Sequence, residues 1–289
     1  MATEIRRELS SETQKRVDSG EIPESRVKDY FKLIDRVEKE ILPHPVITNN
    51  EYTAWFEQGN LSEENVRHFL VQFSVFSNLF ILAQLHKMLN APSLEAMRTS
   101  KEILMNELGV VFRKTSGKKQ EAGDDVDPEL VGTEGTIEGS KFRFAAAHFE
   151  WLLRMTSHVG LEFKDVGKRR HGTKSTLLFC DELSRLYGSA DPHIGLGASF
   201  AVENWAAAGF WKQLIAGLKD YKQKHAPQMP LAFFTWHDQV EDQHAAHTWD
   251  ELEEEYFDFD VNHDKFINGG VEMLDGVNAF WKGLNADRK

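Results

Sequence analysis

The chain has 289 residues, 41% of them apolar, and a formal net charge of -12 at pH 7. That charge argues against nucleic-acid partners and against binding to an anionic membrane, because both need a basic protein face. The single cysteine, Cys180, excludes an internal disulfide framework and a multi-cysteine zinc site.

The first 41 residues predict an N-terminal helical extension. The stretch from Met1 to Lys15 is charged and lacks the apolar core of a signal peptide. The longest apolar run, Phe73 to Leu85, is interrupted by serine and asparagine and is too short to cross a bilayer. We therefore expect a soluble, cytoplasmic protein with no membrane partner and a single helical domain over 1–289.

Helical periodicity dominates the chain, and period-2 alternation of β-branched residues is nearly absent, which predicts an all-α fold without a sheet. Asn50, Ser62 and Ser93 each precede acidic residues, as helix N-caps do. The segment 116–140 is rich in glycine and acid and predicts a flexible insertion. The expected helices span 4–17, 24–41, 50–58, 62–90, 93–111, 140–160, 174–188, 194–224, 229–257 and 263–284.

The segment 233–257 contains the most specific candidate for a site. His237, Glu241 and His244 are spaced i, i+4, i+7. On a helix they lie within about 60° of one another on one face. Two imidazoles and a carboxylate suit a first-row metal that takes nitrogen and oxygen ligands. A polar, solvated helix face is the alternative interpretation.

Three further candidates come from other predicted helices. Glu203 is the only charged residue in the apolar stretch 194–211, and a lone buried carboxylate is costly unless it is paired or metal-bound. Glu107 and His148 also have apolar neighbours, although a surface glutamate and a core histidine are the alternatives. Together, three carboxylates and three imidazoles from four helices match the way helical bundles hold two metal ions.

Two other segments resemble ligand-binding motifs but lack residues that those motifs require. The run 258–264 begins like an EF-hand loop, but His263 and Gly269 stand where a glycine and a bidentate glutamate are required. The run 167–175 approximates a P-loop, but Thr173 intrudes and no strand precedes it. We interpret it as a basic loop, and Cys180 as a core residue.

The order Glu107, His148, Glu203 and then His237-x3-Glu241-x2-His244 resembles the haem-oxygenase-like di-iron oxidases. Residues 42–85 also look like the opening helices of that superfamily, which includes haem oxygenase, the thiaminase-type proteins and the pyrroloquinoline-quinone synthase. The resemblance covers 42–257. It implies a haem-oxygenase-like helical bundle in which these six residues are the metal ligands.

The resemblance also implies a function, that of a dioxygen-activating, non-haem di-iron oxidase or oxygenase with two Fe(II) ions and dioxygen as co-substrate. Members of the family desaturate, oxidatively cleave or N-oxygenate small molecules, often amino acids or fatty acids. We therefore expect a small-molecule substrate. A homodimer and an external electron donor are left open as partners.

The sequence departs from the family pattern in two places. Glu241 stands where aspartate is usual, and the insertion 116–140 separates Glu107 from His148, which are normally a few turns apart. Whether a fold can join Glu107 to His148 across this insertion is the central structural question.

Three other functions are weighed against the di-iron interpretation. The main alternative is a metal-independent small-molecule enzyme or binder on the same fold, although its branches lack the full set of six ligands. A haem-degrading enzyme is disfavoured because His44 lies between prolines and the chain is acidic. A partner-binding scaffold would predict an exposed or salt-bridged Glu203.

Overall fold

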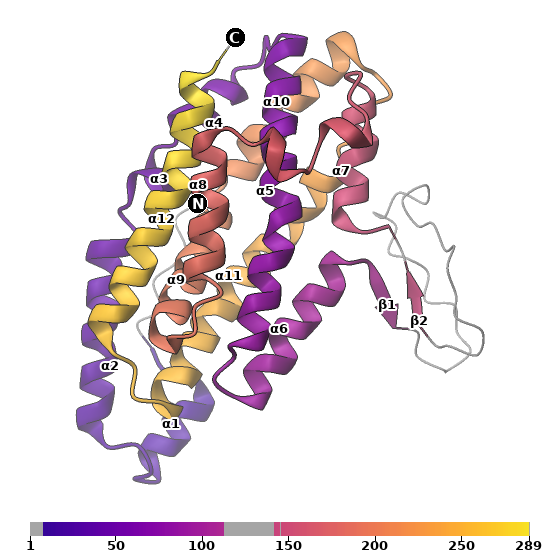
Figure 1. Cartoon of the computed structure of the whole chain (residues 1–289). Helices are drawn as coiled ribbons and strands as arrows, with labels where there is room; N and C mark the ends of the chain where they lie inside the picture. The colour runs from indigo at the N-terminus through magenta and orange to yellow at the C-terminus, as the bar shows by residue number, and fades with distance from the viewer. Residues whose placement is uncertain (1–7, 113–141, 145, 289) are drawn as a thin grey trace.

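The computed structural model describes residues 8–112, 142–144 and 146–288, and the side chains of 111–112, 142–144 and 240–247 lie outside this description. The fold is an all-α helical bundle, which confirms the predicted class (Figure 1). The helices are α1 (Ser11–Asp18), α2 (Glu24–Arg36) with the π-helical turn η1 (Val37–Ile41), α3 (Pro45–Thr48), α4 (Glu51–Glu57), α5 (Glu63–Leu89), α6 (Leu94–Glu107), α7 (His148–Ser157), α8 (Lys174–Leu186), α9 (Pro192–Ala206), α10 (Phe210–His225), α11 (Ala232–Asp258) and α12 (His263–Ala286).

Several of these helices begin at the N-cap residues that the sequence predicted. The predicted N-caps Asn50, Ser62 and Ser93 each accept a hydrogen bond from the backbone N–H three residues later. At α5 the bond is reciprocal, because the side chain of Asn65 accepts from the backbone of Ser62. Such caps satisfy N–H groups that have no partner inside the helix.

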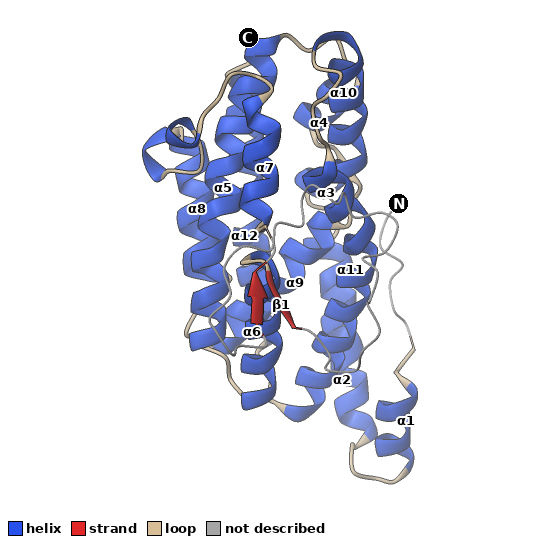
Figure 2. Ribbon diagram, turned by 90° about the vertical axis from the view of Figure 1, so that its right-hand side faces the viewer, coloured by secondary structure: helices blue, strands red, loops and turns tan. Residues whose placement is uncertain are grey.

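The core lies where α12 runs along α8 and α9, and α5 and α11 close the bundle (Figure 2). Large aromatic rings fill this interior, and the rings of Phe69, Phe73 and Phe234 lie within ring-contact distance of one another. Because protein interiors pack densely, this aromatic content fixes the spacing of the helices.

Among the described residues, one helix, α5, is long and apolar enough to cross a membrane by length and composition alone. Its most apolar window has a mean hydropathy of 1.4, and 44% of that window is buried. The apolar run 73–85 by itself is too short to cross a membrane, but the complete helix α5 is longer. Because α5 packs against α6, α7 and α8, the finding is consistent with a core helix of a soluble protein.

A two-stranded antiparallel ribbon shows that the prediction of a fold without a sheet was wrong at this point. It pairs β1 (Val110–Phe112) with β2 (Phe142–Phe144), so that Val110 lies opposite Phe144. The expected helices 93–111 and 140–160 are therefore too long, since α6 ends at Glu107 and α7 begins at His148. The expected insertion 116–140 lies outside the described residues.

The expected helix 194–224 is two helices. The chain breaks between α9 and α10 at Gly209, whose backbone φ of 94° lies in the left-handed region that favours glycine. The break lets α10 turn back to pack against α4 and α11.

The N-terminal helices are tied to the connection between α11 and α12 by three arginine–aspartate ion pairs. Arg16 lies 2.9 Å from Asp258, Arg26 lies 3.0 Å from Asp260, and Arg36 lies 2.7 Å from Asp264. The acidic run that resembles an EF-hand loop therefore anchors the N-terminal helices through ion pairs.

Candidate metal centre

The ribbon brings together the two candidates that the sequence left far apart. Glu107 is the last residue of α6 and His148 is the first residue of α7. Between them, β1 and β2 pair side by side, so the chain returns to the place where it left the bundle. As a result, Nδ1 of His148 lies 3.0 Å from a carboxylate oxygen of Glu107.

His237 approaches the same point from the facing helix α11. Its Nδ1 donates a hydrogen bond to the carbonyl oxygen of Phe233, at 2.6 Å. A carbonyl only accepts, so this bond places the proton on Nδ1 and the lone pair on Nε2, as in many metal-binding histidines. The indole ring of Trp211 stacks on the imidazole at 4.9 Å and 22°.

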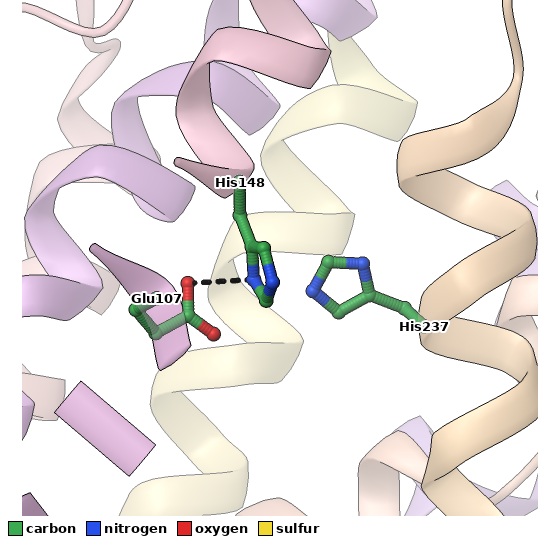
Figure 3. A group of neighbouring side chains, drawn as sticks. All are labelled: Glu107, His148 and His237. Atoms are coloured by element: carbon green, nitrogen blue, oxygen red, sulfur yellow. Dashed lines mark ion pairs between the residues drawn. The ribbon is translucent and has the colours of Figure 1, made fainter. Parts of the chain in front are cut away.

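These three side chains form a compact group (Figure 3). One ligand atom from each of Glu107, His148 and His237 lies within 4.8 Å of the other two. His148 is buried, with 4% of its side chain exposed, and Glu107 is 16% exposed. Two nitrogens and a carboxylate oxygen are ligands that iron, manganese and zinc accept.

The contact between His148 and Glu107 fits metal coordination. The buried Nδ1 of His148 has no aligned hydrogen bond within the described part of the chain, although the Glu107 oxygen lies 3.0 Å away. Two ligand atoms, each about 2.1 Å from one ion and at right angles, are about 3 Å apart. The spacing therefore suits two atoms directed at a shared cation.

Glu203 lies on α9 and lines the same cavity as Glu107 and His237, but it is not part of the group of three. Burial raises the pKa of Glu203 to about 7, and the charges of Glu251 and Glu107 act in the same direction. Lys87 and a hydrogen bond from Tyr187 oppose this rise. A carboxylate in such an environment gains from a nearby cation.

The other two predicted ligands are Glu241 and His244. Both positions lie on α11, one and two turns beyond His237, but their side chains lie outside the described residues. Their role as ligands stays a prediction.

A cavity of about 760 Å³ adjoins the three clustered residues. Both Glu107 and His237 contribute to its wall. Three tryptophans also form this wall, together with three phenylalanines of α5. The aromatic lining consists of Phe73, Phe76, Phe80, Trp205, Trp211, Phe233, Trp236 and Phe259. These rings favour an apolar ligand group at their part of the wall, whereas the rest of the wall includes carboxylates such as Glu251 and Glu255.

Sequence reasoning missed a polar set beside this cavity. Gln84 and Lys87 are one turn apart on α5, and the side-chain amide of Gln84 donates to the hydroxyl of Tyr187 at 2.8 Å. Two polar residues at helical spacing at the end of an apolar helix were the available signal. Their partners, Tyr187 just after α8 and Ser199 on α9, could not be foreseen, because these contacts join distant parts of the chain.

The remaining motifs have structural explanations. Burial raises the pKa of the Cys180 thiol to about 12, which agrees with a core residue that does not react. In the basic loop, Arg169 makes a bidentate pair with Asp181, at 2.6 and 2.8 Å.

Comparison with known proteins supports the fold. No family model matches the sequence, and no curated protein matches it. A solved structure with a similar fold is a CADD-like protein of unknown function from Nostoc punctiforme PCC 73102. The TM-score is 0.56 at 14% sequence identity, over 90% of this chain and 96% of that chain. At this identity the likeness shows a shared fold and nothing finer.

Proposed function

We propose that this chain is a dioxygen-activating, non-haem di-iron oxidase or oxygenase that acts on a small molecule. The observation that carries the proposal is the meeting of Glu107, His148 and His237 beside a large cavity that is lined in part by aromatic rings. A partner-binding scaffold would leave Glu203 exposed or salt-bridged. Glu203 is part-buried in the cavity wall, although the charge of Lys87 acts on it.

Each residue has a defined task in this proposal. Glu107, His148 and His237 would hold one ion, and Glu203, Glu241 and His244 would complete a second position. Iron bound there would supply the capacity to bind and reduce dioxygen. The hydrogen bond from His237 to the Phe233 carbonyl fixes the ring, so that its Nε2 keeps one orientation.

The cavity supports a substrate with an apolar body. Trp211 and Trp236 both contact the candidate ligands, since Trp211 stacks on His237 and the ring of Trp236 lies 4.5 Å from that of His148. These rings would hold an apolar group beside the metal ligands and keep bulk water out. Reducing equivalents would come from the substrate or from an external electron donor.

Anaerobic loading with ferrous iron tests the proposal. We expect the metal-free protein to take up about two irons per chain, the count that a bundle-held di-iron centre requires. On admission of dioxygen, a transient visible absorption should follow. His237→Ala and Glu107→Gln should each reduce the iron count and the absorption, because each removes a ligand.

His158→Ala is the matched control, since His158 is exposed at the opposite end of α7 from His148. It should bind iron as the unmodified chain does. Failure of the unmodified chain to bind iron, or an iron count that His237→Ala leaves unchanged, contradicts the proposal.

A further inference from the structure

The cavity wall is aromatic near the start of α11 and acidic near the end of that helix. Phe233 and Trp236, in the first turns, belong to the aromatic part. The acidic side chains that α11 contributes to the wall are Asp250, Glu251, Glu254, Glu255 and Asp258. Helix α6 adds Glu95 and Glu102. Among the described residues of the wall, Lys87 is the only lysine or arginine, so the acidic end has an excess of negative charge.

Lys87 does not turn the acidic end into a site for an anion, because its ammonium is already surrounded by the protein. The ammonium lies 2.7 Å from the hydroxyl oxygen of Ser199 and 3.7 Å from a carboxylate oxygen of Glu251. It also lies 5.0 Å from the ring centre of Tyr187. A carboxylate ligand would have to compete with Glu251 and would be repelled by the other carboxylates of the wall. The charge of this end therefore favours a cationic ligand group.

The carboxylates of the acidic end differ in their partners. Glu251 pairs with Lys87, and Asp258 lies 2.9 Å from a guanidinium nitrogen of Arg16. Glu255 is part-buried and lies one turn beyond Glu251 on α11. In the part of the chain that the structure describes, the side chain of Glu255 forms no hydrogen bond and no ion pair.

The surroundings of Glu255 make its negative charge costly. Burial raises the pKa of the Glu255 carboxyl to about 7. The charges of Glu251 and Glu254 add to this rise, and the charge of Lys87 opposes it. A cationic ligand group beside Glu255 would relieve that cost.

Gln84 provides a second, independent acceptor. It is fully buried, lines the cavity and lies one turn before Lys87 on α5. Its amide nitrogen donates to the hydroxyl of Tyr187, but its Oε1 accepts no hydrogen bond within the described residues. An unsatisfied buried acceptor is costly, and a ligand group that donates hydrogen bonds would satisfy it. Both Gln84 and Glu255 thus call for a donor.

The two ends of the cavity are far apart. Glu255 lies 18 residues beyond His237 on α11, which corresponds to about 27 Å along the helix axis. A ligand that occupies both the acidic and the aromatic end is therefore long and extended.

We propose that the cavity binds a long-chain primary amine, with its ammonium group at Glu255 and its apolar chain directed toward the aromatic end. An ammonium carries a positive charge and three N–H donors and has no acceptor, which complements a wall of acceptors. That such an amine is the substrate rests on the proposed function. The binding itself concerns the metal-free chain.

The test compares ligands that share one chain but differ in headgroup. Decylamine, decanol and decanoate are titrated into the metal-free protein, and the fluorescence of the tryptophans in the cavity wall reports binding. At about pH 8 the Glu255 carboxyl, with its pKa of about 7, is mostly ionised, whereas the amine stays protonated. We expect decylamine to bind at least about tenfold more tightly than decanoate, with decanol between them. Ethylamine, which lacks the chain, should bind at least about a hundredfold more weakly than decylamine.

Two variants show whether Glu255 holds the headgroup. Glu255→Gln should weaken decylamine binding at least about tenfold and leave decanol binding unchanged, because only the charged headgroup needs the carboxylate. Glu64→Gln, at an exposed position in the first turn of α5, changes the net charge equally and should alter neither affinity. Decanoate binding as tightly as decylamine overturns the inference. So does a Glu255→Gln variant that binds decylamine normally or that loses affinity for decylamine and decanol equally.

Iron loading separates this inference from the proposed function. A chain that binds iron but shows no preference for decylamine keeps the proposed function and loses the amine site. If the chain binds decylamine through Glu255 but takes up no iron, the proposed function fails and the amine site remains as a binding site.

Discussion

At the scale of single residues, His263 shows how burial and charge compete. Its Nε2 lies 3.1 Å from the hydroxyl of Tyr256 and 3.4 Å from a carboxylate oxygen of Asp29. Burial lowers the pKa of His263 below the usual 6.5, with Arg36 and Arg26 acting in the same direction, whereas Asp29 and Asp264 oppose the shift. The folded protein therefore binds the His263 proton less readily than the unfolded chain does.

A pH dependence of stability follows from this lowered pKa. As pH falls through about 6.5, the unfolded chain gains the His263 proton first, so the free energy of unfolding should fall. His263→Gln removes the titrating group, so relative to the unmodified chain it should lose less stability, or gain more, as pH falls from about 7 to about 5. Denaturant titrations at each pH measure the difference between the two curves. An equal slope for the unmodified chain and His263→Gln would count against this origin.

Sequence patterns point to a candidate residue when it differs in character from its neighbours on the same helix. Glu203 stands out because its helix is otherwise apolar, and the structure places it in the cavity wall. Lys87 carries no comparable signal, because its importance depends on Ser199 and Glu251, which lie on other helices. Contacts between residues far apart in the chain leave no periodic pattern in the sequence.

At the scale of elements, the ribbon explains how the candidate centre tolerates the long separation between Glu107 and His148. Strands of three residues are too short for a period-2 pattern, so the sequence predicted helix over the first two residues of β1 and over all of β2. The turn into β1 depends on Gly109, whose backbone φ is 71°. Gly109 lies two residues after Glu107, and its left-handed conformation ends α6 there.

Gly109→Ala tests the coupling between this turn and the centre. An L-residue in the left-handed region costs roughly 1–2 kcal/mol, so the free energy of unfolding should fall by about that amount. Because strain at this turn shifts Glu107 relative to His148, the affinity for Mn²⁺ should fall as well. Gly20→Ala is the control, since Gly20 has a φ of 80° and nothing within 4 Å of an added Cβ. It should lose similar stability with unchanged Mn²⁺ affinity; an equal loss of affinity in both variants would show that the turn does not position the centre.

At the scale of the whole molecule, the close approach of α9 and α12 holds the bundle together. Three residues of this seam are glycines, Gly197, Gly269 and Gly270, and at Gly197 the backbones of the two helices nearly touch. A Cβ added to Gly197 would lie 1.9 Å from the carbonyl oxygen of Phe266. The sequence predicted that both segments are helical, but the depth of their contact depends on which glycines face each other, which no single-helix pattern reveals.

Two glycines of α9 therefore give opposite predictions for the same substitution. Gly197→Ala forces α9 away from α12, and overpacking of this kind costs about 1–3 kcal/mol of unfolding free energy. A Cβ on Gly195 would meet its nearest atom, the carbonyl oxygen of Ser189, at 3.7 Å, which is ordinary contact. Gly195→Ala should thus be neutral or stabilising by up to about 1 kcal/mol, because alanine loses less backbone entropy in a helix. Denaturant unfolding of both variants measures the difference, and equal effects would mean that α9 and α12 do not meet at Gly197.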